Sequence, residues 1–328
     1  IDESMKRKYG EMLKKKKFWI GFILSIVVVV ILGLGFAGNY LVNYALVVDK
    51  NGNIGSMNGE TYQGHQDTEA QEYYDNWIKD QKINEWTIKN DEGNQLWAQI
   101  YEPKQSSNIY VLAVHGYTVD HRDIAPAIVP FVEKGWNVIA IDQRGRGNSE
   151  GNLLTMGFHE KDDVVLWAKY ICQQDPNAQI VLYGESMGAA TIMMAAGETD
   201  LPKQVVAVVE DCGYTSAYDM FKDQLKERFG LAEFPFLPAA SLVGQIRFGF
   251  DFYDANVETQ LQKAKLPILF IHGGDDDYVP TYMGKALYEN YQNEKELLII
   301  DGAGHGQSSD VNPEKYYQTI FDFLKKYM

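Results

Sequence analysis

IVLYGESMGAAT, residues 180–191, is the stretch that decides the fold of this chain. The residues before Gly184 favour a strand, and a run that favours a helix begins at Met187. Ser186 lies on the corner between them, with a glycine two positions away on each side. This G-x-S-x-G pattern predicts a strained turn that projects the serine hydroxyl above the edge of a sheet. Glycine is expected at both flanking positions because a side chain there would collide with the neighbouring chain. The alternative is an ordinary strand-to-helix connection in which Ser186 only caps the helix.

Strands and helices alternate on both sides of this corner. The pattern predicts strands at 109–116, 136–142, 178–184, 204–212, 266–273 and 295–301, and helices at 125–135, 159–174, 186–197 and 313–328. Residues 84–103 alternate around NDEGN, which predicts a β-hairpin, and 68–81 can form a helix. Apolar strands that alternate with helices indicate an α/β fold with a mostly parallel central sheet and helices on both faces. In such sheets the chemistry lies in the loops beyond the C-terminal strand ends.

Charge is distributed unevenly along the 328 residues. Residues 1–17 hold seven Lys and Arg against three acidic residues, whereas the other 23 basic and 42 acidic residues leave the rest of the chain at −19. A part of the chain with this much negative charge should repel phosphates, so we expect no nucleic-acid partner. Cys172 and Cys212 lack partners at metal-ligand spacing, which argues against a zinc site. We interpret them as two separate thiols, with one disulfide as the alternative in an exported protein.

Residues 18–38, FWIGFILSIVVVVILGLGFAG, form an uncharged apolar run. A helix of this length reaches about 30 Å, the thickness of the hydrocarbon core of a bilayer. Phe18 and Trp19 lie at its start, where interfacial aromatic residues are expected. A secretory signal would have a shorter apolar core and a better cleavage site than GLGFAGN, so the run predicts an uncleaved transmembrane anchor. Because the basic residues precede it, we expect a single-pass protein of the cell membrane, with a cytoplasmic N-terminus and an extracellular main domain.

The glycines of this run allow a second interpretation. Gly33, Gly35 and Gly38 match the G-x-G-x-x-G pattern of dinucleotide-binding proteins. That pattern requires a short strand before it and a full helix after it. Here the preceding apolar run is too long for a strand, and the following one breaks within about a dozen residues. We therefore interpret the match as a coincidence.

The chain is thus expected to have four parts. These are a basic cytoplasmic head (1–17), the anchor (18–38), a stalk with a leading helix (39–83) and the main domain (84–328). The stalk is inferred from residues 39–66, which are rich in Asn and Gly.

A serine becomes a nucleophile only with a base, normally a histidine that a carboxylate orients. His305 is the favoured base because it lies in DGAGHGQ, a glycine-rich loop directly after the last predicted strand. The other five histidines fit less well. His65 lies in the stalk, His121 on a loop and His159 at a helix start, and His115 and His272 end buried strands where structural roles are expected.

The acid should follow a strand between the serine and the histidine. The segment FIHGGDDDYVP offers Asp275, Asp276 and Asp277, of which at least two are expected to be solvated turn residues. Asp211, after the strand at 204–212, is a second candidate.

Six segments together resemble the α/β-hydrolase superfamily. They are HGYTVDHRD, IDQRGRGNSEG, GESMGAAT, EDCGYTS, IHGGDDDYVP and GAGHG, which occur in that order between residues 115 and 306. The chain is similar, more narrowly, to bacterial membrane-anchored serine hydrolases of the esterase/lipase and S33-peptidase-like group, over roughly residues 84–328. The resemblance implies Ser186 as nucleophile, His305 as base and Asp276 as acid, although three consecutive aspartates leave the acid open by one position.

The resemblance also implies an oxyanion hole and a cap. The backbone N–H groups of Tyr117 and Met187 would stabilise the oxyanion. Residues 214–258 would form a small helical cap whose apolar side chains line an acyl or alkyl pocket, although packing alone explains most of them.

The expected activity is hydrolysis of carboxylic esters through an acyl-enzyme. The resemblance implies a small ester or acyl substrate, and no metal or organic cofactor. A serine peptidase or a thioesterase is the nearest alternative, because the same residues cleave amides and thioesters. An aminopeptidase would need a cap carboxylate to hold the amino terminus of its substrate, such as Glu227, Glu233 or Asp219. A catalytically silent, anchored binding protein is the alternative from another class.

Overall fold

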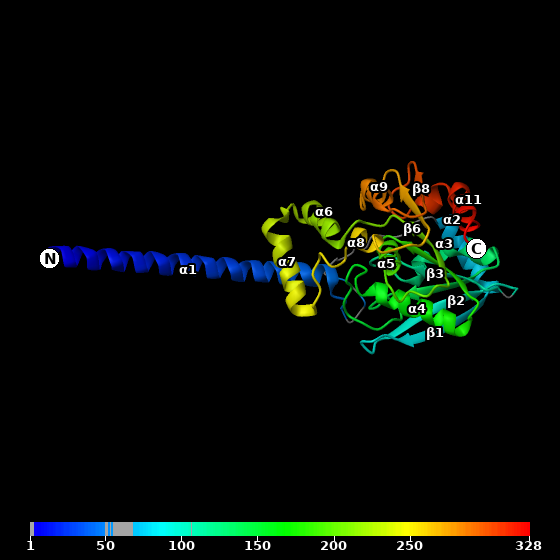
Figure 1. The fold of residues 1–328 in the computed structure, drawn as a ribbon, viewed down its shortest axis with the longest axis horizontal. Helices are drawn as coiled ribbons and strands as arrows, with labels where there is room; N and C mark the ends of the chain where they lie inside the picture. Colours follow the sequence, from blue (N-terminus) through cyan, green and yellow to red (C-terminus); the bar gives the residue numbers. More distant parts are fainter. Residues whose placement is uncertain (1–2, 50–51, 53, 55–67, 106) are drawn as a thin grey trace.

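The computed structural model describes residues 3–49, 52, 54, 68–105 and 107–328 (Figure 1). Its centre is an eight-stranded sheet in the order β1-β2-β4-β3-β5-β6-β7-β8. β1 pairs antiparallel with β2 and β2 with β4, and every later pair is parallel, which confirms the mostly parallel sheet. The strands are β1 (Lys82–Lys89), β2 (Gln95–Glu102), β3 (Ile109–Val114), β4 (Asn137–Asp142), β5 (Gln179–Glu185), β6 (Val205–Asp211), β7 (Ile268–Gly273) and β8 (Lys295–Ile300).

Helices cover both faces of this sheet, which explains why its central strands are apolar throughout. Every residue of β4 and β7 is buried. One face packs against α4 (Glu160–Gln174), α5 (Met187–Ala195), α8 (Val257–Leu261) and α9 (Thr281–Asn290), and the other against α2 (Thr68–Trp77), α3 (His121–Glu133) and α11 (Pro313–Leu324). Short helices at Ile78–Asp80 (η1) and Ser308–Val311 (α10) complete the body. The edge strand β1 alternates between exposed and half-buried residues, as expected for one side of a hairpin.

Helix α1 (Glu3–Leu46) runs straight through the predicted anchor and past its expected end. It extends from the globular body as a long rod (Figure 1). By length and composition it can cross a membrane. Residues 3–17 of the predicted head and the whole predicted anchor therefore lie on one continuous helix.

The predicted stalk is wrong for residues 39–48. Residues 39–46 continue α1 into the body, where Val42 and Leu46 are fully buried, and Val47 then pairs with Leu153. The Asn and Gly residues suggested an irregular segment, but the apolar residues between them pack against the core. Of the remaining stalk, residues 50–51, 53 and 55–67, which include His65, lie outside the described part of the chain.

Two helices form the predicted cap between β6 and β7. They are α6 (Ala217–Phe229), which Ser216 caps at its N-terminus and Gly230 ends in a left-handed conformation, and α7 (Glu233–Phe248). α7 crosses α1 where α1 leaves the body (Figure 1). A Cβ at Gly38 would lie only 2.8 Å from the carbonyl oxygen of Ala239, so this close crossing requires glycine in α1.

Candidate active site

Ser186 lies on a strained turn, as the G-x-S-x-G pattern predicts. Its φ of 55° and ψ of −117° place a non-glycine residue in a region that side chains rarely adopt. A Cβ at Gly184 would lie 2.6 Å from the backbone of Gly188, and a Cβ at Gly188 would lie 2.0 Å from the carbonyl oxygen of Val114. Both glycines are therefore required by backbone contacts. The side chain of Ser186 makes no capping bond to α5, so a simple helix-cap role does not explain it.

The hydroxyl of Ser186 points instead at His305. The Oγ atom lies 2.8 Å from Nε2 of His305, whose Nδ1 lies 2.8 Å from Oδ2 of Asp276. His305 is held by the loop after β8, and Asp276 by the loop after β7, at the C-terminal edge of the sheet. Because a carboxylate can only accept, Nδ1 of His305 carries the proton and Nε2 presents its lone pair to the serine. Three loops far apart in sequence thus bring the three predicted residues into one hydrogen-bonded chain.

Asp276 is kept ionised by its surroundings. Burial alone would raise the pKa of this carboxyl, but hydrogen bonds from His272 and His305 outweigh burial and hold its pKa at about 2. Its other oxygen, Oδ1, accepts from the backbone N–H groups of Tyr278 and Val279 at 3.0 and 2.9 Å. The side chain is therefore fixed in position as well as in charge.

The other acidic candidates do not reach His305. Asp275 and Asp277 are exposed to solvent. Asp211 is buried, but its carboxylate accepts from the hydroxyl of Ser308 at 3.1 Å, and its backbone carbonyl accepts from the N–H of Ser186 at 2.8 Å. Asp211 thus stabilises the turn at Ser186 through a backbone hydrogen bond. Of the four candidate aspartates, Asp276 is the one whose carboxylate contacts His305.

The remaining described histidines have structural contacts. His115 is fully buried, accepts from the N–H of Gln143 and donates to the carbonyl of Gly116, and burial lowers its pKa. His121, predicted on a loop, is instead the first residue of α3 and lies 2.8 Å from Asp142. It was misplaced because the N-cap Asp120 starts the helix earlier than the apolar periodicity indicates.

His272 has a closer relation to the site than sequence analysis assigned to it. Its Nε2 lies 2.9 Å from the carbonyl of Val279 and 3.4 Å from Oδ2 of Asp276, the oxygen that also contacts His305. Burial lowers the pKa of His272, but Asp276, Glu210 and the carbonyl of Val279 together outweigh this effect and raise the pKa. The i, i+4 spacing of His272 and Asp276 was the signal available in the sequence.

The two predicted oxyanion donors border the serine. Tyr117, Ser186 and Met187 line one pocket, and a Cβ at Gly116 would lie 3.6 Å from the Cβ of Ser186. Within the described residues, neither the N–H of Tyr117 nor that of Met187 donates to a protein acceptor. The hydroxyl of Tyr117 donates to the carbonyl of Ala45, so the end of α1 holds this loop in place.

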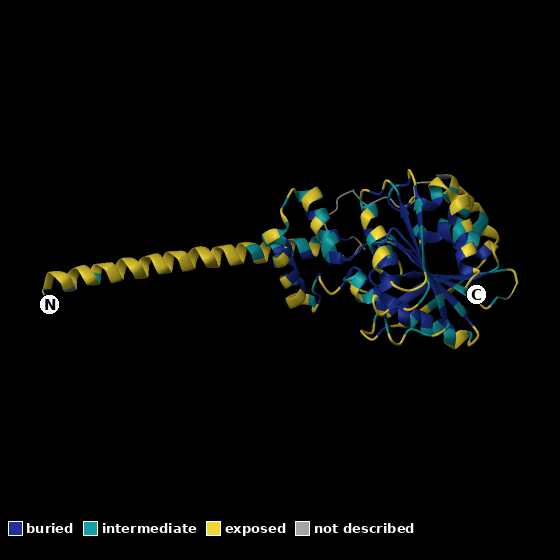
Figure 2. Ribbon diagram, turned by 45° about the horizontal axis from the view of Figure 1, so that its top comes forward, coloured by how far each residue is buried: buried dark blue, intermediate teal, exposed yellow. Residues whose placement is uncertain are grey.

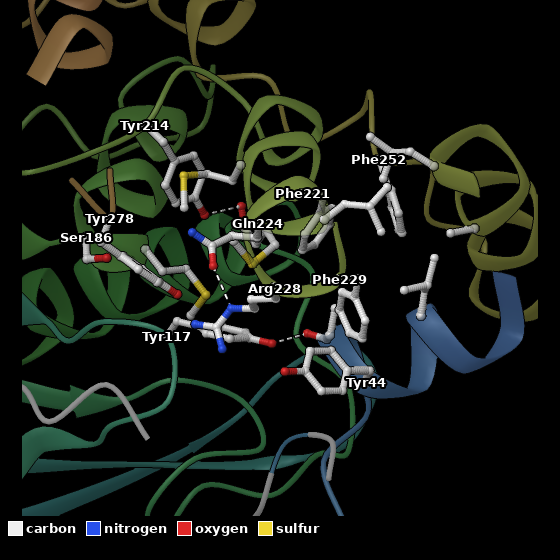
Figure 3. Close-up of a pocket in the computed structure, with 18 residues that line it drawn as sticks. Tyr44, Tyr117, Ser186, Tyr214, Phe221, Gln224, Arg228, Phe229, Phe252 and Tyr278 are labelled. Carbon is white, nitrogen blue, oxygen red and sulfur yellow. Dashed lines mark hydrogen bonds between the residues drawn. The ribbon is translucent and has the colours of Figure 1, made fainter. Parts of the chain in front are cut away.

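Two pockets meet at Ser186. The larger holds about 760 Å³ of empty space, part of it open to solvent. Its walls are mostly apolar and come from the body, the cap and α1 (Figure 3). The α1 residues are Leu41, Tyr44 and Ala45, which the predicted stalk had excluded from the site.

Arg228 is the only cation among the residues that line the larger pocket in the described structure. Its Nε donates to Oε1 of Gln224 at 2.7 Å, one turn away on α6, and the guanidinium lies among Tyr44, Tyr117 and Tyr278 (Figure 3). The sequence did not indicate that Gln224 and Arg228 line a pocket, because a charged residue on a short helix usually faces solvent.

The smaller pocket is more polar and lies on the His305 side of the serine. Its lining includes His305, Asp123 and Glu185, and it shares Tyr117, Ser186 and Tyr278 with the larger one. The serine hydroxyl is thus flanked by an apolar space and by a polar space next to the histidine.

Two groups of side chains among the described residues have metal-ligand spacing. One is Cys212 with Asp276 and His305, and the other is Asp120 with His121 and Asp142. In the second group Asp142 already accepts from His121 and from the N–H of Asn148, and Asp120 accepts from Arg122. These hydrogen bonds give the second group a structural explanation.

The comparisons with known proteins concern the family and the fold of the chain. Residues 105–212 match a family described as "Serine aminopeptidase, S33". The uncharacterized protein YqkD of Bacillus subtilis (strain 168) is 29% identical over 223 residues, which are 68% of this chain and 72% of YqkD. Alpha/beta hydrolase domain-containing protein 17B of Xenopus laevis is 22% identical over 289 residues, 87% of this chain and 86% of that protein. A solved esterase of Pyrococcus furiosus is similar with a TM-score of 0.63 and 24% identity, covering 76% of this chain and 92% of that chain.

Proposed function

We propose that this chain, an α/β-hydrolase, is a serine hydrolase that cleaves carboxylic esters through an acyl-enzyme. Its family and structural matches support hydrolase activity. The observation that carries the finer proposal is the hydrogen-bonded chain from Ser186 through His305 to Asp276.

In the proposed reaction Ser186 Oγ attacks the ester carbonyl while Nε2 of His305 takes its proton. Asp276 holds the ring in the tautomer that can accept this proton and stabilises the resulting imidazolium. The N–H groups of Tyr117 and Met187 stabilise the negative charge on the carbonyl oxygen. His305 then protonates the departing alcohol, and a water molecule activated by the same ring releases the acid.

The position of His305 supports a proposed role for each of the two pockets. The leaving group must lie next to the nitrogen that protonates it, and only the smaller pocket includes His305 in its lining. The alcohol therefore occupies the polar pocket, and the acyl chain occupies the larger apolar one.

The acyl pocket favours an ester over an aminopeptidase substrate. No acidic residue is among its described lining residues, and Arg228 would repel a free amino terminus. The three carboxylates considered for that role lie elsewhere. Asp219 accepts from the hydroxyls of Thr215 and Ser216, Glu233 accepts from Tyr218, and Glu227 does not line the pocket.

The α1 helix supports a membrane anchor. We propose that it crosses the cell membrane once, with the basic head in the cytoplasm and the hydrolase domain outside. Protease added to intact cells should then degrade the domain after residue 49. Protection of that domain, together with an accessible N-terminus, would reverse the orientation.

A rate comparison tests the substrate class. The wild-type chain should hydrolyse p-nitrophenyl esters of straight-chain acids much faster than p-nitroanilides of free amino acids. Arg228→Gln should narrow this difference by about tenfold, because the charge that opposes an ammonium group is gone. Faster turnover of the aminoacyl anilides by the wild type would favour the aminopeptidase alternative.

A further inference from the structure

The cap helix α7 exposes apolar side chains that its packing leaves without a protein partner among the described residues. Residues 234–246 contain no charge, yet Phe234 is 79%, Leu242 60% and Ile246 74% exposed. Leu242 and Ile246 are four residues apart and share a helix face. The opposite face is buried: Leu237 and Ala240 belong to the main core cluster, and Gly244 lies close to the carbonyl oxygen of Phe250.

The position of α7 along α1 indicates what covers this face. From Phe18 to Leu32, each large apolar side chain of α1 is between 45% and 68% exposed. Burial begins at Gly38, the last residue of the predicted anchor and the residue where α7 crosses. Tyr40, 47% exposed, lies two residues after Gly38, as expected for an aromatic residue at a membrane boundary. The level at which α1 leaves the bilayer is therefore the level of α7.

The exposed face of α7 points toward that bilayer. Because its buried face packs on α1, on α6 and, through Leu237 and Ala240, on the core cluster, its exposed face points away from the body, which is the side toward which α1 extends (Figures 1 and 2). Nη1 of Arg247 donates to the side-chain oxygens of Asn39 and Asn43 at 2.7 and 2.8 Å. These bonds fix the two helices to each other just beyond the crossing.

We propose that α7 lies in the membrane interface with Leu242 and Ile246 inserted, and that the substrate is a lipid ester taken from the bilayer. The second part rests on the proposed function. Leu237 and Ala240, on the buried face of α7, line the acyl pocket, and so do Leu41 and Tyr44 of α1. Leu41 follows Gly38 by three residues, about 5 Å along the helix axis. Helix α7 thus forms part of the wall of the acyl pocket and also contacts the membrane. An acyl chain can therefore pass from the bilayer into the pocket without crossing water.

The membrane contact is tested without reference to activity. The full chain carrying Cys172→Ser and Leu242→Cys, labelled with an environment-sensitive nitrobenzoxadiazole dye, is placed in phosphatidylcholine nanodiscs that contain nitroxide-labelled lipid. Cys212 is buried and should not react. The matched control carries the dye at Lys325→Cys, near the C-terminus and on the far side of the body from α1 (Figure 1). The nitroxide lipid should quench the dye at 242 and leave the dye at 325 unchanged. Equal quenching at both sites would overturn the proposed contact of α7 with the membrane. So would a dye at 242 that is shielded from water but not quenched, which is the result that contact with a second copy of the chain would give.

The substrate class is tested with the double variant Leu242→Gln, Ile246→Gln in the same nanodiscs. Neither residue lines the pockets that meet at Ser186, so hydrolysis of a soluble short-chain ester should match the wild type. Hydrolysis of a long-chain fluorogenic ester dissolved in the bilayer should fall at least tenfold. Equal rates on the bilayer ester, or equal loss on both esters, overturns the inference. A wild type that hydrolyses neither ester contradicts the proposed function, whereas the quenching result still decides the docking.

Discussion

Replacing Asp276 by asparagine should abolish most of the activity without unfolding the protein. In the structure Oδ1 of Asp276 accepts two backbone N–H groups, from Tyr278 and Val279, and Oδ2 accepts from Nδ1 of His305. The amide oxygen of an asparagine can replace only one of these oxygens. If it keeps the two backbone bonds, its NH₂ group faces His305 and demands an acceptor at Nδ1. The proton of the ring then moves to Nε2, where it points at Ser186 and prevents the ring from acting as a base.

The expected loss in kcat is about 10⁴-fold, or about 5.4 kcal/mol of activation free energy, as for a triad held in the wrong tautomer. The assay is the steady-state hydrolysis of a soluble p-nitrophenyl ester, with a thermal melt of each variant to verify folding. Asp277→Asn is the matched control, because its side chain is one position away and exposed, and it should retain nearly full activity. A folded Asp276→Asn variant that keeps more than a tenth of the wild-type kcat would refute this reasoning, as would a larger loss in Asp211→Asn.

Two further predictions concern stability. Gly188→Ala should destabilise the fold by about 1–3 kcal/mol, because the added carbon would lie 2.0 Å from the carbonyl oxygen of Val114. The melting temperature of Gly35→Ala should not change, because nothing lies within 4 Å of the added carbon, and equal melting of the two variants would contradict the collision. Burial raises the pKa of the Glu210 carboxyl to about 8. The folded state therefore binds this proton more tightly than the unfolded state, and stability should fall as pH rises from about 4.5 to 8, by up to about 1.4 kcal/mol per pH unit from this group. Glu210→Gln should remove that part of the slope in urea titrations at several pH values, and an unchanged slope would show that the carboxyl is ionised in the fold.

Apolar strands that alternate with helices predicted an α/β fold with a mostly parallel sheet, and the resemblance of six segments implied the α/β-hydrolase fold. The comparisons and the sheet order confirm that fold. The sequence also predicted which serine, histidine and aspartate segments meet, since parallel strands present their C-terminal loops at one edge. It left the acid open between adjacent aspartates, because one-residue offsets in a loop have no periodicity. Burial and the contact with His305 single out Asp276.

Contacts between segments that are far apart in the sequence were harder to predict. The end of α1 was assigned to a stalk, yet Leu41, Tyr44 and Ala45 line the acyl pocket and Ala45 accepts from Tyr117. Local composition could not reveal this, because Asn and Gly at 38–43 serve a helix crossing rather than a loop. Gly38 allows the backbone of α1 to approach Ala239 of α7 closely, and the side chains of Asn39 and Asn43 accept hydrogen bonds from Arg247. The cap aromatics likewise have pocket and packing roles that look alike in sequence.

The most direct test of the proposed function is intact-protein mass spectrometry after incubation with a fluorophosphonate. The wild type should gain one adduct, and Ser186→Ala should gain none, because the probe reacts with a serine that a histidine has activated. Ser186→Ala removes one oxygen and should remain folded, while its hydrolytic rate falls on the order of a million-fold. His305→Ala should cost a similar factor, and the double variant little more. An adduct that persists on Ser186→Ala, or a folded wild type that never reacts, would contradict the serine-hydrolase mechanism and favour a binding protein with the same fold.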